Sequence, residues 1–165
     1  MAVYAQPWIN TAYALIGTRE TPGPRNTQEI MNWARLTGLS NVYTADSIPW
    51  CGLFVSFCMV DNGWQPPDQP LWALNWNKFG FKLPEPAFGA IMVFKRNGGG
   101  HVGFYISEDR YNYHILGGNQ ADMVSITKVS KDRCVGYRWP QGAEHLLMKG
   151  RRYATLNGPI SRNEA

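Results

Sequence analysis

The stretch SIPWCGLFVSFCMVDNG, residues 47–63, predicts a helix at the centre of the fold. Ser47 to Cys51 open this helix, and Asn62-Gly63 ends it. Apolar side chains lie almost all the way round it, a pattern typical of helices that are buried on every side. We therefore expect a central, buried helix with Cys51 in its first turn.

Two further helices are predicted before this stretch. Pro7 suits a first helical turn, and apolar residues from Trp8 to Ile16 share one face at helical spacing. Asn26, followed three residues later by Glu29, resembles a capping box that opens a second helix. The first half of the chain is therefore expected to be helical.

The second half has the shorter period of strands. Apolar segments separated by turn residues predict an antiparallel sheet, with strands at 90–94, 101–106, 113–116, 123–129 and 134–139. Helices followed by strands indicate an α+β fold. Because the pattern fades after residue 140, we expect one domain over residues 1–140 and a basic, poorly ordered tail over residues 141–165.

The composition excludes several classes of protein. Hydrophobic residues make up 44% of the 165 residues, which is enough for a sizeable core and too many for a disordered chain. A net charge of +4 is too small to indicate nucleic-acid binding. No apolar run approaches the roughly 18 residues that span a bilayer, so stable membrane insertion is not expected. The first residues carry no charged region ahead of an apolar run, which predicts synthesis in the bacterial cytoplasm without a signal peptide.

Cys51 is the leading candidate for a nucleophile. Unpaired N–H groups and the dipole at a helix start stabilise a thiolate, and the same N–H groups can hold the oxyanion formed by attack on a carbonyl. The position also suits a cysteine that only fills the core. Cys58, deeper in the same helix among aromatic residues, is expected to be such a core residue, and Cys134 is not expected to be catalytic.

His101 is the best-placed base for the Cys51 thiol. It follows Gly98-Gly99-Gly100 and opens a predicted strand, where a ring is held more rigidly than in a loop. His114 lies inside another predicted strand, where a structural role is ordinary, and His145 lies where the pattern fades.

The segment LGGNQ, residues 116–120, places two amide side chains at the end of the next strand. An amide oxygen there can orient the imidazole of His101, and Asn119 is the first choice, with Gln120 as the alternative. Taken alone, the segment is also an ordinary glycine turn with capping amides. Together, Cys51, His101 and Asn119 form a nucleophile, base and orienting residue in the order of Cys-His-Asn hydrolases.

Three motifs resemble those of the NlpC-like and CHAP superfamily of cysteine peptidases and amidases. They are SIPWCGLFVSFCM, GGGHVGFYI and ILGGNQ, and the resemblance, over roughly residues 8–140, is closest to small phage and prophage endolysin-type members. It implies a papain-like fold with N-terminal helices packed on an antiparallel sheet. Many CHAP members carry an acidic residue on the strand after the histidine, where this chain has Gly117-Gly118, so Asn119 or Gln120 must orient His101.

The resemblance implies a peptidoglycan hydrolase that cleaves an amide bond of the bacterial cell wall. We expect an endopeptidase or N-acetylmuramoyl-L-alanine amidase from a phage or prophage, with Asp46, Trp50 and Gln120 as accessory or substrate-binding residues. The alternatives are a secreted antibacterial effector with an immunity protein and a non-catalytic wall-binding module that uses the many aromatic rings.

No cofactor is implied, and no metal site is expected because HExxH and CxxC motifs are missing. The site of action is expected to be the cell wall, in the periplasm, after release or delivery. The basic residues 149–152 are expected either to be a solvated end or to make weak contact with anionic wall polymers or lipids.

Overall fold

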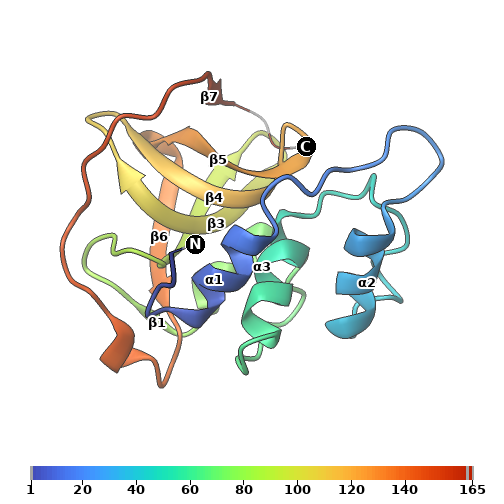
Figure 1. Cartoon of the computed structure of the whole chain (residues 1–165), viewed down its shortest axis with the longest axis horizontal. Coiled ribbons are helices and arrows are strands. Elements are labelled where there is room, and N and C mark those ends of the chain that lie inside the picture. Colours follow the sequence, from blue (N-terminus) through green and yellow to red (C-terminus); the bar gives the residue numbers. More distant parts are fainter. Residues whose placement is uncertain (1, 163, 165) are drawn as a thin grey trace.

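The computed structural model describes residues 2–162 and 164 and shows an α+β fold, with helices along one side of a seven-stranded sheet (Figure 1). The helices are α1 (Pro7–Ala14), α2 (Gln28–Leu36) and α3 (Cys51–Val60), followed by the 3-10 helix η1 (Ala73–Lys78). The predicted fold class is therefore confirmed, with helices in the first half and strands in the second.

Helix α3 is the central helix that its sequence predicts. Eight of its ten residues are buried, since it packs on α1 and α2 and also on the sheet. It begins at Cys51 itself, so residues 47–50 form the approach to the helix. The expected capping box at the start of α2 is not formed: Thr27 is the N-cap, and Asn26 Oδ1 instead accepts the backbone N–H of Asp46 at 3.0 Å.

The sheet has the strand order β1-β6-β2-β3-β4-β5-β7. Its strands are β1 (Phe81–Lys82), β2 (Ile91–Arg96), β3 (Gly99–Glu108), β4 (Asn112–Gln120), β5 (Met123–Ser130), β6 (Cys134–Trp139) and β7 (Ile160–Ser161). Neighbours from β1 to β5 pair antiparallel, as predicted, but β7 pairs with β5 in parallel and makes the sheet mixed. A shift of register interrupts the pairing of β4 with β5 between Gly117 and Gln120.

Glycines in β4 let the sheet approach the start of α3 closely. A Cβ atom at Gly118 would lie 2.8 Å from Phe54 Cβ and 2.8 Å from the Trp50 ring. These distances are too short for real side-chain carbons, so only glycine fits between the helix and the strand. The LGGNQ motif therefore sets the distance between the strand β4 and the helix that carries Cys51.

The C-terminal segment, residues 141–162 and 164, differs from the poorly ordered tail that its sequence predicts. It forms the 3-10 helix η3 (Glu144–Leu146), runs along the outside of the sheet and ends beside β5 (Figure 1). Backbone hydrogen bonds join Glu108 to Arg152 and Ala154, and Arg151 forms a salt bridge with the buried Glu108 side chain. Such contacts leave no apolar periodicity in a sequence, which explains the difference.

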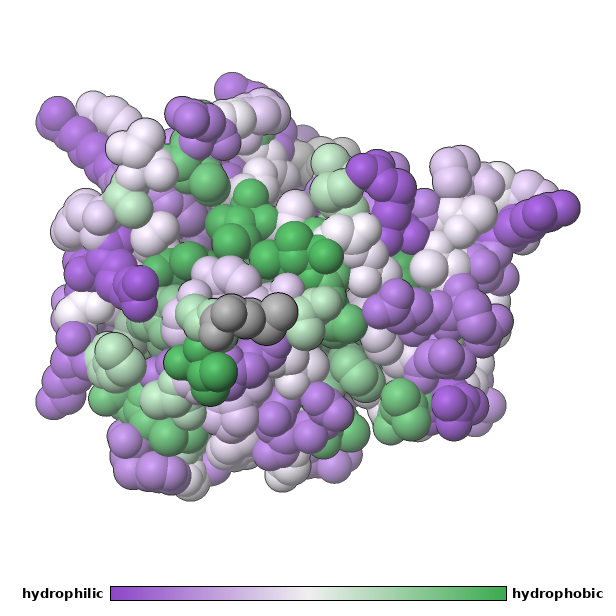
Figure 2. Space-filling view, viewed as in Figure 1, coloured by the Kyte–Doolittle hydropathy of each residue, from purple (hydrophilic) through white to green (hydrophobic). Residues whose placement is uncertain are grey.

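The surface in Figure 2 is the face seen in Figure 1. Hydrophilic residues cover most of its periphery, and hydrophobic residues gather near its centre. Within residues 2–162 and 164, no helix is both long enough and apolar enough to cross a bilayer.

Candidate active site

Cys51 is the first residue of α3, directly after the N-cap residue Trp50, and 5% of its surface is exposed. Burial opposes ionisation of the thiol, but the His101 imidazole and backbone hydrogen bonds from Val102 and Gly52 outweigh it. The pKa of Cys51 therefore lies below its usual value.

The other two cysteines contrast with Cys51. Cys58 lies deeper in α3 and is fully buried, and burial raises its pKa well above the usual value. Burial also raises the pKa of Cys134 to about 11. Cys51 is thus the cysteine whose surroundings favour the thiolate, because it has the His101 imidazole that the other two lack.

His101 lies on β3 with its ring fully buried against the Cys51 thiol. Burial lowers the tendency of the ring to take up a proton, but Cys51 and then Glu164 and Gln120 more than offset this. The pKa of His101 is therefore raised. The two groups favour each other's charged forms, as expected for a thiolate–imidazolium pair.

Gln120 holds the ring of His101. Its Oε1 lies 2.9 Å from His101 Nε2, and its amide nitrogen donates to the backbone oxygens of Ile115 and Ser125 at 3.1 and 2.7 Å. The amide orientation is fixed by those two acceptors, so Oε1 must accept a hydrogen from Nε2. Nδ1 is then the nitrogen left to exchange a proton with the Cys51 thiol.

The structure does not bring Asn119 to His101, which corrects the first choice made from the sequence. Asn119 has a backbone φ of 58°, and its Nδ2 donates to the backbone oxygen of Glu164 at 2.6 Å. The physical reason is the register shift between Gly117 and Gln120, which breaks the simple alternation of side chains along β4. Gln120, the alternative, takes the position beside the ring.

Asp46 is a buried anchor for a loop, not an accessory residue at the cleft. Its Oδ2 accepts the backbone N–H groups of Thr21 and Thr27 at 3.0 and 2.6 Å. The carboxylate therefore fixes the loop before α2, and the expected accessory role is corrected.

Trp50 is also fully buried, and its Nε1 donates to Glu20 Oε1 at 2.9 Å. Its ring packs against Gly118 of β4, so it supports Cys51 on the side of the sheet. Because the ring is fully buried, it is not available to a substrate. His114, the weaker base candidate, is engaged elsewhere: its ring nitrogens lie 2.7 Å from Ser107 Oγ and 3.0 Å from Asp109 Oδ2.

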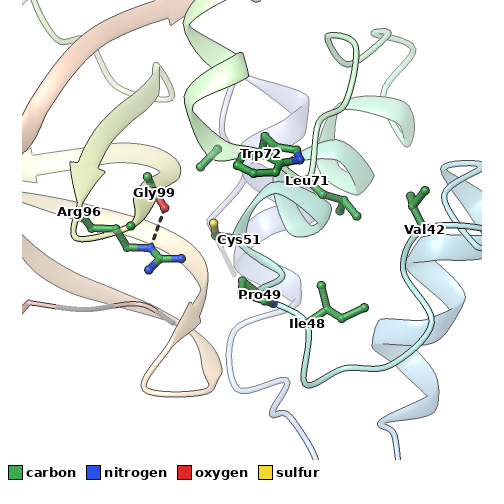
Figure 3. Close-up of a pocket in the computed structure, with 11 residues that line it drawn as sticks. Val42, Ile48, Pro49, Cys51, Leu71, Trp72, Arg96 and Gly99 are labelled. Carbon is green, nitrogen blue, oxygen red and sulfur yellow. Dashed lines mark hydrogen bonds between the residues drawn. The ribbon is translucent and has the colours of Figure 1, made fainter.

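A cleft of about 410 Å³ borders Cys51 (Figure 3). The sulfur lies between Trp72 and Pro49 on one side and Arg96 on the other. Trp72 is 67% exposed, and Arg96 donates from Nε to the backbone oxygen of Gly100 at 3.0 Å. The cleft therefore combines apolar walls with one guanidinium, next to the thiol.

Trp72 and Arg96 are cleft residues that the sequence does not reveal. Trp72 is one of seven tryptophans, and a sequence pattern does not distinguish the exposed rings from the buried ones. Arg96 lies just before the glycine run that leads to His101, and that proximity is the signal that could have indicated it. In the part of the chain that the structure describes, no three His, Cys, Asp or Glu side chains are grouped to hold a metal ion.

Comparison with known proteins finds a family match over part of the chain. Residues 43–119 match the family model of the CHAP domain, a segment slightly shorter than half of the chain. It contains α3, β2 and β3, with both Cys51 and His101, and it ends one residue before Gln120. None of the curated proteins matches the chain. CHAP domains are typically amidases or peptidases that act on peptidoglycan. Residues 43–119 thus resemble a CHAP domain, and this match is consistent with the CHAP and NlpC-like superfamily.

Proposed function

We propose that this protein is a cysteine hydrolase that cleaves an amide bond of peptidoglycan, with Cys51 as nucleophile and His101 as its acid and base. The observation that carries the proposal is the buried His101 ring against a thiol at the first turn of α3, with that thiol bordering an open cleft. A wall-binding module without catalysis would need the cleft but not the paired thiol and imidazole.

The proposed reaction has two steps, acylation of Cys51 and hydrolysis of the thioester. The Cys51 thiolate attacks the amide carbon, and the backbone N–H of Cys51 at the helix start is placed to stabilise the oxyanion. His101 gives its Nδ1 proton to the leaving nitrogen as the C–N bond breaks, which leaves a thioester on Cys51. A water then loses a proton to His101 and attacks the thioester, which releases a carboxylic acid and restores the Cys51 thiolate and the protonated His101. Gln120 keeps the ring in the orientation that both steps need.

The cleft suits a peptide substrate that carries a carboxylate. Apolar groups of Trp72, Leu71 and Ile48 offer surface to a chain, and Arg96 supplies a positive charge for a carboxylate of the stem peptide. No acidic residue lines this cleft among those that the structure describes. The charge and shape thus favour a substrate with acidic groups beside the scissile amide.

The biological setting that we propose is a phage or prophage endolysin, made in the cytoplasm and acting on the wall in the periplasm after release. Its support is the combination of the WC, GHVG and GGNQ motifs. An antibacterial effector with an immunity protein shares the same chemistry and remains the second setting. Weak contact of residues 149–152 with anionic wall polymers belongs to the same proposal, although Arg151 is already paired with Glu108.

Purified sacculi test the activity. We expect the wild-type protein to release fragments with new N-terminal amines and no new reducing sugars, as read by mass spectrometry. Cys51→Ala should remain folded and lose several orders of magnitude in rate, whereas Cys58→Ala should keep its activity and lose stability, because it opens a small cavity in the core. New reducing ends, or undiminished lysis by Cys51→Ala, would show that a different chemistry operates.

A further inference from the structure

A buried carboxylate lies beside Cys51 and His101 and is not used in the mechanism above. Glu164, near the end of the C-terminal segment, is only 2% exposed, and its Oε1 lies 4.0 Å from His101 Nδ1. Within residues 2–162 and 164, that ring nitrogen makes no hydrogen bond. Glu164 therefore acts on the ring through its charge, at the same nitrogen that exchanges a proton with Cys51.

Several groups hold the Glu164 carboxylate in this position. Arg133 donates to Oε1 at 2.5 Å and to Oε2 at 3.1 Å, and Ser161 Oγ donates to Oε2 at 2.5 Å. Asn119 Nδ2 donates to the backbone oxygen of Glu164 at 2.6 Å. Burying a carboxylate costs free energy unless it is paired, so four hydrogen bonds to one residue mark an organised position.

The polar and charged groups that face His101 come from three parts of the fold. Gln120 on β4 meets Nε2, Cys51 comes from α3, and Glu164 comes from the C-terminal segment with Arg133 behind it. Burial opposes ionisation of Glu164, but Arg133 and His101 outweigh it, so its pKa lies below the usual value and the group is an anion at neutral pH. An anion at this place stabilises an imidazolium.

We propose that Glu164 is a positioning residue for the Cys51–His101 pair, whose carboxylate holds His101 in its protonated form and whose anchor is Asn119. The proposal rests on the role of this pair in the proposed function. It gives Asn119 a function that differs from the one expected from the sequence, since Asn119 acts on the ring through Glu164. It also makes the C-terminal segment part of the active site.

The test is the titration of His101 in the full chain, followed by NMR of the imidazole C–H groups. The chain has three histidines, so His114 and His145 serve as internal references. Glu164→Gln removes the anion, which should lower the pKa of His101 by about one unit, the lower end of the range for a charge at ~4–6 Å, because Arg133 offsets part of the charge. Glu164→Asp should restore most of the difference.

Glu144→Gln is the matched control, because it removes an exposed carboxylate from the same segment. It should leave the His101 titration unchanged. In the hydrolysis assay, the alkaline limb of kcat/KM should move to lower pH in Glu164→Gln by the same amount. If Glu164→Gln does not fold, Asn119→Ala should give a smaller shift in the same direction, because it loosens only the backbone of Glu164.

Three results would overturn the proposal. One is an unchanged His101 titration in folded Glu164→Gln. Another is a shift of equal size in Glu144→Gln. The third is that Glu164→Gln speeds alkylation of Cys51 by the same factor at every pH while the His101 titration is unchanged. That result would mean that the C-terminal segment only shields the site from reagents. Because the titration needs no substrate, a shift without hydrolysis of sacculi would refute the proposed function and leave the role of Glu164 standing.

Discussion

At the scale of single residues, the site depends on which of two adjacent amides faces His101. Gln120 contacts Nε2 of the ring, and Asn119 contacts the backbone of Glu164. Two neighbours in one strand thus serve the same ring from opposite sides, one by a hydrogen bond and the other through a carboxylate. Alanine substitutions at the two positions should therefore have different effects on the kinetics.

Gln120→Ala should lower kcat/KM by about a hundredfold, the effect of misplacing a catalytic group by about 1 Å. The ring loses its only fixed partner at Nε2 within the described residues, so it no longer holds Nδ1 toward Cys51. Asn119→Ala should have a smaller effect on rate at the optimum and should move the alkaline limb of the pH profile. Steady-state kinetics of both variants across pH check this, and equal losses with unshifted profiles would contradict it.

Cys51 and His101 could be predicted from the sequence because their signals are local. A cysteine that follows Pro-Trp at the start of an apolar run, and a histidine after three glycines, are visible in short windows. The choice between Asn119 and Gln120 is not local, since it depends on a register shift between strands. Glu164 and Arg133 lie 31 residues apart and meet only because the C-terminal segment returns to the sheet.

At the scale of elements, the contact between α3 and β4 positions the nucleophile. Gly118 lies against Phe54 and Trp50, and Trp50 directly precedes Cys51. The predicted helix and strands were sufficient to give the fold class. The sequence did not reveal this contact, because glycine in a strand is compatible with a turn, a bulge or a close approach.

Gly118→Ala should destabilise the fold and slow the reaction together. The added Cβ would be 2.8 Å from Phe54 Cβ and from the Trp50 ring, so the start of α3 must shift, at a cost of about 1–3 kcal/mol in the free energy of unfolding. Gly99→Ala is the stability control, because its Cβ would meet only the Arg96 guanidinium at 3.7 Å. Denaturant unfolding of both variants decides the matter, and equal stabilities would argue against a tight contact at Gly118.

At the scale of the whole molecule, the C-terminal segment is fastened to the sheet by charge. Glu108 is fully buried, accepts a hydrogen bond from Tyr105 at 2.7 Å and pairs with Lys131 and Arg151. Burial opposes its ionisation, but Lys131, Tyr105 and Arg151 together hold its pKa below the ordinary value of 4.5. Stability from this group is present above that value and is lost as pH falls through the lowered pKa.

Glu108→Gln should therefore lower Tm at pH 7 by several degrees, for a loss of about 1–3 kcal/mol. It should also flatten the fall of Tm below pH 4.5, since the variant has no carboxylate to protonate at this position. Calorimetry from pH 7 to pH 3 measures both effects, with the exposed Glu144→Gln as reference. A variant whose Tm falls as steeply with acid as the wild type would rule out Glu108 as a source of acid sensitivity.

Strand β7 also determines what the sheet offers to a second copy of the chain. Without it, β5 would be an edge strand with free backbone donors and acceptors, in a β-branched sequence that invites intermolecular pairing. Residues 17–19 cover the start of β5, and β7 covers Lys128 and Val129 near its end. A chain ending at Gly158 should therefore self-associate with rising concentration in light scattering, and Thr127→Lys in that shortened chain should keep it monomeric by placing a charge on the open edge.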